Sequence, residues 1–464
     1  MYVSCSPGIA ALARRVLGNL ASPSFAPAGA SIVADGPPGI RAGSERAVIL
    51  RGGPILTADE ACPVAEALAI RGSRILAVGS ATDVKRHFTR STEILDLEGR
   101  AVLPGFVESH ASVLGSALSD DSEADAAGLL EEDLARVAAL CAATLRDFAA
   151  RGCTTVCDVG VGRLGGTIEH KLLGALARAL DAPVRLRGAL IPELAKELGM
   201  APSAGDERYA AIGIALWADG PLQRSAAALS EPYLDGSGSG CLYHSEAELC
   251  EAMRWWERAG WQLVVHANGE RAAEQAVRCF EEILSRHSHS SRPPTAMPHR
   301  IEGLALADEE LLARAAALGV TLSHPIDQVY FSGQDLRDRL LGAERAARLH
   351  ALLCELEHEL CSSCHGGGRV DPLLSMRTAM TRLMRGSDDV LGPFQQLDLA
   401  QALATVTRNP ARQALLGDRV GMLRSGMLAD LVVLDRDPRA VAPERLHELR
   451  VLETWIGGRR QRWG

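Results

Sequence analysis

The sequence predicts an α/β protein in which a TIM barrel of eight βα units, (β/α)8, carries a composite β-sandwich domain built from both chain ends. Three observations lead to this fold. The chain has 464 residues with 47% apolar content, which is enough for a large barrel core and a smaller domain. Short β-rich runs broken by glycine occur at both ends, in residues 48–104 and 415–464. Between them, over residues 105–414, strand-like and helix-like segments alternate.

The N-terminal segment, residues 1–47, precedes this pattern and is rich in Ala, Gly, Ser and Pro. This composition predicts a flexible arm, with an oligomer contact, as in a homodimer, as the alternative. Residues 7–20 are too interrupted to span a membrane, so no membrane partner is predicted. Arg14 and Arg15 lie in the middle of that stretch, where a secretory signal requires an unbroken apolar run.

Charge and cysteine content narrow the classes of function. The chain has 49 Lys and Arg against 58 Asp and Glu, a net charge of -9, and offers no basic stripe for a phosphate backbone. Nucleic acid is therefore not expected as a partner. The 11 cysteines are an odd number for a fully paired set, and a core of this size does not need disulfides. These features predict a cytoplasmic protein in a reducing compartment.

The central region contains eight candidate barrel strands. A helix predicted over residues 134–152 repeats apolar side chains at helical spacing and precedes the second strand. The strands are predicted at residues 101–110, 153–160, 183–191, 210–220, 261–269, 299–306, 319–326 and 359–367.

Polar side chains gather where these strands end. In a TIM barrel the carboxyl ends of all strands meet at one face, which carries the active site. A single buried histidine is usually a structural residue, but a shared position at one rim favours a site for a small molecule. The rim residues are His110, Asp158, Asp219, His266, Glu302, His324, Cys364 and His365.

Several motifs in order resemble the amidohydrolase superfamily, specifically the amidohydrolase family 3 type. The resemblance extends from about residue 48 to the C-terminus and implies a barrel hydrolase with a composite domain. It rests on "LPGFVESH", "ADGPLQ", "EPYLDG", "GWQLVVHANGERAAEQAV", "HRIEG", "LLGAERAARL", "DPLLSMRTAMTR", "ALATVTRNPARQALL" and "GMLADLVVLDRDP".

The resemblance also implies a metal centre, and here the chain departs from the family pattern. His110 and His266 occupy expected ligand positions, whereas Ala215 stands where binuclear members have a carboxylated lysine. Alanine cannot bridge two cations, so a binuclear centre is not expected. The other expected ligand positions are also substituted, by Ser112, Gly303 and Cys364.

Three interpretations follow. In the favoured one there is no metal, and His110, His266 and His365 act as acid and base groups around Cys364, with "HGGG" supplying backbone N–H donors. In the second, His110, His266 and Cys364 hold one zinc ion with a water in the open position. In the third, the chain is a non-catalytic pseudoenzyme that binds a small molecule.

The predicted reaction is hydrolysis of a C–N bond in a small amide or cyclic amide, as the resemblance implies. Cyclisation, elimination or isomerisation of a biosynthetic intermediate is the alternative, because these reactions need no activated water. His110, His266, Cys364 and His365 are the predicted catalytic residues. The predicted substrate contacts are Ser112, Asp219, Glu302, His324 and Gln328.

Overall fold

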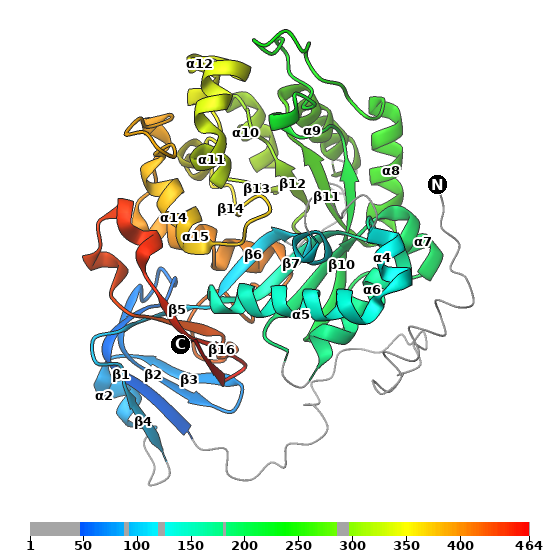
Figure 1. Cartoon of the computed structure of the whole chain (residues 1–464). Coiled ribbons are helices and arrows are strands. Elements are labelled where there is room, and N and C mark those ends of the chain that lie inside the picture. The colour runs from blue at the N-terminus through cyan, green and yellow to red at the C-terminus, as the bar shows by residue number, and fades with distance from the viewer. Residues whose placement is uncertain (1–46, 88–91, 119–125, 180–181, 285–296, 464) are drawn as a thin grey trace.

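The computed structural model describes residues 47–87, 92–118, 126–179, 182–284 and 297–463, so nearly all of the predicted arm lies outside the described residues. Eight parallel strands form a nearly closed barrel, which confirms the predicted fold class (Figure 1). In order around the barrel they are β6 (Phe106–Ala111), β7 (Cys153–Val161), β8 (Arg185–Leu190), β10 (Tyr209–Trp217), β11 (Gln262–Ala267), β12 (Arg300–Gly303), β13 (Thr321–His324) and β14 (Ser362–Cys364).

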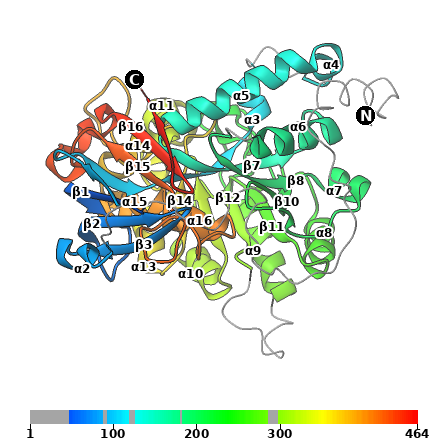
Figure 2. The same ribbon diagram turned by 90° about the horizontal axis from the view of Figure 1, so that it is seen from below.

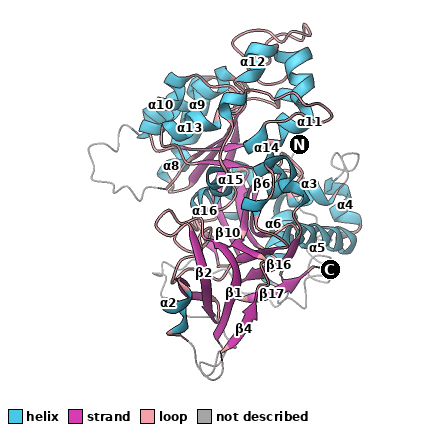
Figure 3. Ribbon diagram, turned by 90° about the vertical axis from the view of Figure 1, so that its left-hand side faces the viewer, coloured by secondary structure: helices cyan, strands magenta, loops and turns pink. Residues whose placement is uncertain are grey.

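Helices surround the barrel strands in the upper half of Figure 3. They form where apolar side chains recur on one face; in α5 (Leu134–Ala150) the buried residues include Leu134, Val137, Cys141 and Leu145. The others are α3 (Val113–Ala117), α4 (Ala126–Glu132), α6 (Gly166–Arg178), α7 (Pro192–Leu198), α8 (Glu246–Arg258), α9 (Glu270–Leu284), α10 (Glu309–Ala317), α11 (Asp327–Asp335), α12 (Ala343–Ala347), α13 (Leu352–Glu357), α14 (Pro372–Thr381), α15 (Leu399–Thr405), α16 (Arg408–Gln413) and the π-helix η4 (Leu336–Leu341). The short helix α2 (Ala81–Lys85) lies apart from them, in the lower half of Figure 3, against the sheet built from the chain ends.

The two chain ends build one separate sheet, as predicted. Figure 2 shows β15 and β16, from the C-terminal end, beside β1, β2 and β3 from the N-terminal end. The central link is β5, which pairs antiparallel with β15. The strands are β1 (Ala47–Leu56), β2 (Val64–Arg71), β3 (Arg74–Gly79), β4 (Glu93–Asp96), β5 (Ala101–Pro104), β15 (Leu431–Leu434), β16 (Val451–Ile456) and β17 (Arg459–Arg462); a short β9 (Ala204–Gly205) pairs with β10.

The first predicted barrel strand divides between the two sheets at Gly105. Residues before it pair within the terminal sheet as β5, and residues after it pair with the barrel as β6. A Cβ atom at position 105 would lie 2.2 Å from Cγ2 of Thr154, so only glycine fits between the two sheets. This crossing point explains why one continuous apolar run in the sequence becomes two strands.

An apolar cluster fills part of the barrel interior below the rim. Side chains from five strands, including Val107, Ala215 and Val264, pack against Ala411 of α16 and Leu416 in this cluster. Ala215 is fully buried in it. The interior is therefore filled by side chains, as in other TIM barrels.

One covalent link joins two outer helices. Cys250 of α8 and Cys279 of α9 form a disulfide. This pairing was not predicted, because the cysteine content alone indicates reduced thiols. None of the helices in the described ranges is both long and apolar enough to cross a membrane.

A buried ion pair connects the barrel to the terminal sheet. Nε and Nη2 of Arg185 on β8 donate to the carboxylate of Asp430 at 2.9 and 3.1 Å. Asp430 also accepts the backbone N–H of Gly457 at 2.6 Å, between β16 and β17. Both side chains of the pair are 1% exposed, so each charge depends on the other.

Asp430→Ala should strongly destabilise the protein. The substitution leaves the buried Arg185 charge with only Glu207 as an acidic partner, and breaking a buried pair costs about 3–5 kcal/mol. Urea unfolding measures the loss. The matched control is Asp435→Ala. The partner of Asp435, Arg450, is 77% exposed, so this substitution should lower the free energy of unfolding by less than about 1 kcal/mol. Equal losses in the two variants would contradict the role given to the buried pair.

Candidate active site

Three side chains at the barrel rim form a compact cluster. The ligand-type atoms of His110, Glu302 and His365 all lie within 4.8 Å of one another. Nδ1 of His110 lies 2.8 Å from Oε2 of Glu302, and Nε2 of His365 lies 4.0 Å from the same oxygen. The imidazole rings of His110 and His365 stack, with centroids 4.6 Å apart. The predicted rim site thus exists as a physical cluster of groups.

The strands explain why these side chains meet. Between Glu108 and Ala111, β6 advances three residues against two on β7, and His110 lies within this irregularity. Such a bulge re-aims a side chain relative to the strand's regular alternation. On the opposite wall, His266 of β11 is in register with Glu302 of β12.

Arg300 lies beneath the cluster and controls its charge. Its guanidinium, 1% exposed, forms an ion pair with Oε1 of Glu302 and donates to the backbone oxygen of Ser109 at 2.9 Å. Burial alone would raise the pKa of Glu302, but Arg300, with His110, holds that pKa well below its ordinary value. Glu302 is therefore a carboxylate at neutral pH, and it accepts the Nδ1–H of His110.

His266 faces His110 at right angles, with ring centroids 5.2 Å apart. Its other face stacks on Trp217 of β10 at 4.7 Å. Burial lowers the pKa of His266 to about 3, with the nearby His110 contributing, so the ring is neutral at physiological pH. Nε2 of His266 is buried and has no hydrogen-bond partner among the described residues.

The tautomer of His365 follows from its backbone contact. Its Nδ1 accepts the N–H of Gly367 at 3.1 Å, so in the neutral ring the proton is on Nε2. Burial lowers the pKa of His365 well below its ordinary value, which keeps the ring neutral. The N–H of Gly367 is consequently engaged, and it is not available as one of the backbone oxyanion donors that the "HGGG" motif predicts.

Cys364, which the sequence predicts as part of the site, lies outside the cluster of His110, Glu302 and His365. Successive residues of a strand point to opposite faces, so with His365 in the cluster Cys364 faces outward. It is in register with His324 and forms a hydrogen bond with Thr405 of the outer helix α15. Burial raises the thiol pKa above its ordinary range. The predicted ligand set of His110, His266 and Cys364 is therefore not formed.

Two of the predicted substrate contacts, Ser112 and Asp219, accept backbone N–H groups in the structure. Ser112 caps α3 by accepting the N–H of Gly115 at 3.1 Å. Asp219 accepts the backbone N–H groups of Ala228, Asn268 and Gly269, each at 2.8 Å. Both residues lie at strand ends, next to loops whose backbone N–H groups need hydrogen-bond acceptors, which explains these contacts.

His324 is fully buried, and both of its ring nitrogens lie near protein acceptors. Its Nε2 lies 2.9 Å from Glu355, and its Nδ1 lies 3.1 Å from the backbone oxygen of Gly303. Gln328 is in the first turn of α11, and its Oε1 is buried without a hydrogen-bond partner among the described residues. A substrate contact for Gln328 stays a prediction.

Sequence reasoning missed two residues of the site, Arg300 and Trp217. Each lies two positions from a residue on the same strand face, Arg300 from Glu302 and Trp217 from Ala215. That period-two spacing is visible in the sequence and could have placed both side chains inside the barrel. The family motifs mark only the residues at the strand ends.

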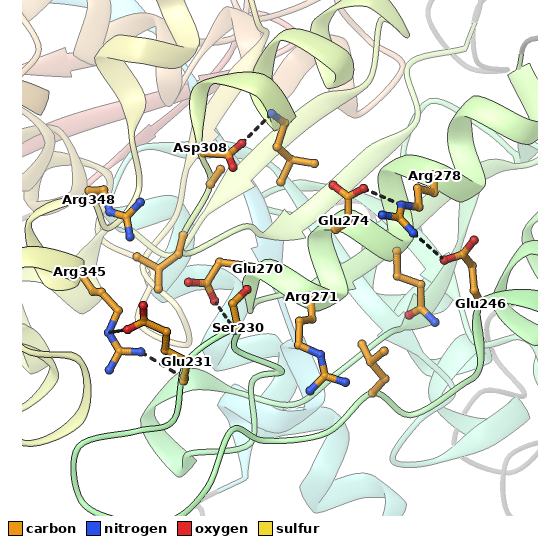
Figure 4. A pocket seen from close by; sticks show the side chains of 15 residues that line it. Ser230, Glu231, Glu246, Glu270, Arg271, Glu274, Arg278, Asp308, Arg345 and Arg348 are labelled. Carbon is orange, nitrogen blue, oxygen red and sulfur yellow. Dashed lines mark hydrogen bonds and ion pairs between the residues drawn. The ribbon is translucent and has the colours of Figure 1, made fainter.

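A separate pocket of about 560 Å³ lies beside the start of α9 and is lined by none of the cluster residues (Figure 4). Some of its charged groups are paired. Arg278 pairs with Glu274 at 2.6 Å and with Glu246 at 3.7 Å, and Arg345 donates to the backbone oxygens of neighbouring residues. The pocket therefore has a charged lining that is only partly ion-paired.

Comparison with known proteins identifies the family. The sequence model of the amidohydrolase family matches residues 114–461, more than half of the chain. The chain belongs to the amidohydrolase family. This confirms the resemblance that the motifs indicate, and it makes the chain a hydrolase-like member of that family.

Individual relatives of this amidohydrolase are distant. YtcJ of Bacillus subtilis (strain 168), named as an amidohydrolase, is 30% identical over 52% of this chain, and the match spans 45% of that protein. The 5-methylthioadenosine/S-adenosylhomocysteine deaminase of Syntrophobacter fumaroxidans is 27% identical over 86% of this chain and 87% of its own. A metal-dependent hydrolase of Pyrococcus horikoshii superposes with a TM-score of 0.71 at 20% identity, over 86% of this chain and 99% of its own. That likeness shows the fold.

The spacing of His110, Glu302 and His365 would allow a shared metal ion, but the state of the donors does not fit one. Both carboxylate oxygens of Glu302 are engaged, one by Arg300 and one by His110. His365 carries its proton on Nε2, and metal ligation requires an unprotonated nitrogen. A dication would also add charge beside the buried Arg300 guanidinium.

The backbone at Gly303 closes another ligand position. Its φ is +99°, and a Cβ atom there would lie 2.5 Å from Oδ1 of Asn268. The histidine that the family pattern expects at this position would therefore clash and would require a strained backbone. The described residues do not fit the metal centre of the family.

Gly303→Ala should destabilise the protein more than Gly426→Ala does. Gly426 has a similar φ of +88°, but no atom lies within 4 Å of its added Cβ. Gly426→Ala therefore measures the cost of the backbone conformation without a steric clash. The additional clash at position 303 should cost about 1–3 kcal/mol. Thermal melts of both variants measure the difference, and equal losses would show that position 303 can accept a side chain.

Proposed function

We propose that this amidohydrolase hydrolyses a C–N bond in a small amide or cyclic amide without a catalytic metal, and that His110 is the general base. The observation that carries this proposal is the buried chain from Arg300 through Glu302 to His110. Family membership and the names of the relatives support hydrolysis as the reaction class.

His110 has the geometry of an oriented base. Its Nδ1–H donates to the Glu302 carboxylate, so the lone pair is on Nε2. The side chain is 25% exposed, which leaves it accessible to a bound water. When Nε2 takes a proton from that water, the imidazolium is stabilised by the ionised Glu302.

Two neutral imidazoles would polarise the substrate carbonyl. Nε2–H of His365 is a donor that faces the cluster. His266 offers a second donor in the tautomer with the proton on Nε2, the buried nitrogen without a partner. Preorganised N–H donors in a site shielded from water stabilise the oxyanion that forms as water adds to the carbonyl.

The proton balance closes on His110. Water adds its oxygen to the carbonyl carbon while its proton moves to Nε2 of His110. The same proton is then donated to the leaving nitrogen as the C–N bond breaks, which yields a carboxylic acid group and an amine. Neither step requires Cys364.

Trp217 limits how deeply a substrate can enter. It stacks on His266, and its ring lies 3.4 Å from the Cβ position of Gly160 on the neighbouring wall of the barrel. The ring therefore covers the fully buried Ala215 layer. We infer that the substrate binds above this ring, between His110 and His266.

Glu302→Gln and His266→Ala should each lower turnover by about 10²-fold or more, because the first removes the charge that stabilises the imidazolium and the second removes a carbonyl donor. The assay uses linear N-acyl amides together with five- and six-membered cyclic amides as probes, with product amine measured by mass spectrometry.

Cys364→Ser is the matched control for these variants. Its thiol faces the outer helix layer, so turnover should stay within about threefold of the wild type. Full activity in Glu302→Gln would overturn the proposed base, and loss of activity in Cys364→Ser with an unchanged melting temperature would restore a role for the thiol.

Removal of metal should not change turnover. After dialysis against a strong chelator, activity should remain within about twofold of the untreated protein, because the proposed base is the His110 imidazole, oriented by Glu302, and not a metal-bound water. Elemental analysis of the dialysed protein confirms that metal has been removed. Activity that is lost on dialysis and restored by zinc would contradict the metal-free mechanism.

A further inference from the structure

The charged pocket beside α9 lies on the same face of the barrel as the rim cluster but is separate from it (Figure 4). Its walls come from the segments that follow β10, β11 and β12, including Ser230, Glu270 and Leu306. Segments that follow barrel strands lie at the face where a TIM barrel binds its ligands. The volume of about 560 Å³ is within the range of sites for small molecules. The proposed hydrolysis uses none of the side chains that line this pocket.

Two anchors fix the walls of the pocket. The buried carboxylate of Asp219 accepts the backbone N–H groups of Ala228 and Gly269, each at 2.8 Å. Gly269 directly precedes Glu270 at the start of α9. On the wall formed by α8 and α9, the disulfide between the two helices lies one residue from Arg278. A preformed pocket loses less conformational entropy when it binds a ligand.

Two arginines of the lining have no acidic partner among the described residues. Arg271 is in the first turn of α9, and Arg348 directly follows α12. Figure 4 draws no interaction for either guanidinium, whereas it joins Arg278 to two glutamates. The guanidinium of Arg345 also differs, because its three nitrogens donate to backbone oxygens. The free guanidiniums of Arg271 and Arg348 can therefore donate to a ligand oxygen, above all to a carboxylate.

The lining also contains acceptors that lack a strong donor. Oε2 of Glu270 accepts the backbone N–H of Ser230 at 3.4 Å, which is long for a hydrogen bond. Gln275 is 4% exposed, and its Nε2 donates to the backbone oxygen of His244 at 2.8 Å. Its Oε1 is buried without a hydrogen-bond partner in the part of the chain that the structure describes. An unpaired buried acceptor is costly, so a ligand that donates a hydrogen bond would be favoured here.

The balance of charges in the lining selects among ligands. Five acidic side chains and four arginines line the pocket. A ligand with two negative charges would meet the acids, and a ligand with two positive charges would meet the free guanidiniums. A ligand that carries one charge of each sign matches both kinds of group. The buried side chains of Leu306 and Leu311 add an apolar surface for a hydrocarbon group.

We propose that this pocket binds a zwitterionic ligand with the chemistry of a short peptide whose two ends are free. Its carboxylate and carbonyl oxygens accept hydrogen bonds from Arg271 and Arg348. Its ammonium and amide N–H groups donate to Glu270 and Gln275, and an apolar side chain contacts Leu306. This second site is independent of the proposed hydrolysis at the rim.

Equilibrium dialysis of the wild-type protein against trialanine tests the pocket, with the intact peptide measured by mass spectrometry. Binding should be saturable. N-acetyltrialanine lacks the ammonium and trialanine amide lacks the carboxylate, so each should bind about tenfold more weakly, because a charge-assisted hydrogen bond is lost. Succinate, a dianion, and 1,4-diaminobutane, a dication, should both bind more weakly than trialanine.

Arg271→Gln and Arg348→Gln should each weaken the binding of trialanine about tenfold, because each removes one free guanidinium. The variant that no longer distinguishes trialanine from its amide identifies the arginine that binds the carboxylate. Glu270→Gln should lose the preference for a free ammonium group. The matched control is Arg51→Gln, which changes an exposed arginine on β1 of the terminal sheet and should bind like the wild type. Thermal melts check that all variants are folded.

Three outcomes would overturn the proposal. The first is equal affinity for trialanine and for the peptide blocked at both ends, and the second is no binding of trialanine at about 10 mM. The third is binding that is lost in Glu302→Gln but kept in both arginine variants, which would place the peptide at the rim. Normal peptide binding in a protein without hydrolytic activity would refute only the proposed hydrolysis.

Discussion

The buried guanidinium of Arg300 is the constraint on which the rest of the site depends. An unpaired charge at that depth would cost several kcal/mol, so Glu302 has to stay ionised beside it. The ionised carboxylate then fixes the proton of His110 on Nδ1 and leaves the lone pair on Nε2. The charge balance of the rim, the poor fit to a metal ion and the proposed base all follow from this one pairing.

The departures from the family pattern are physically consistent with one another. Ala215 leaves space that apolar side chains fill, and Trp217 above it stacks on His266. Gly303 adopts a backbone conformation that a side chain at that position could not share. The chain therefore keeps the frame of an amidohydrolase while aromatic and hydrogen-bonded groups occupy the layer in which the family places its metal.

Polar residues at the strand ends divide into two sets with different tasks. His110, His266, Glu302 and His365 lie against one another at the barrel rim. Asp158 and Asp219 accept backbone N–H groups of loops and helix starts, and His324 bonds to Glu355 of α13. The sequence does not distinguish the two sets. Polar residues occur at strand ends in both, because backbone groups of the adjoining loops also need hydrogen-bond partners.

The sequence by itself determined the barrel, its eight strands, the shared terminal sheet and the rim position of the histidines, because these features depend on local periodicity and on motif order. Only the tertiary structure decided which rim residues converge. A bulge in β6 places His110 beside Glu302, and strand alternation turns Cys364 outward while His365 faces in. The pairing of Arg300 with Glu302 and the disulfide between Cys250 and Cys279 were likewise decided by folding. Side-chain direction at a strand end changes with a single residue of register, and the sequence does not mark that shift.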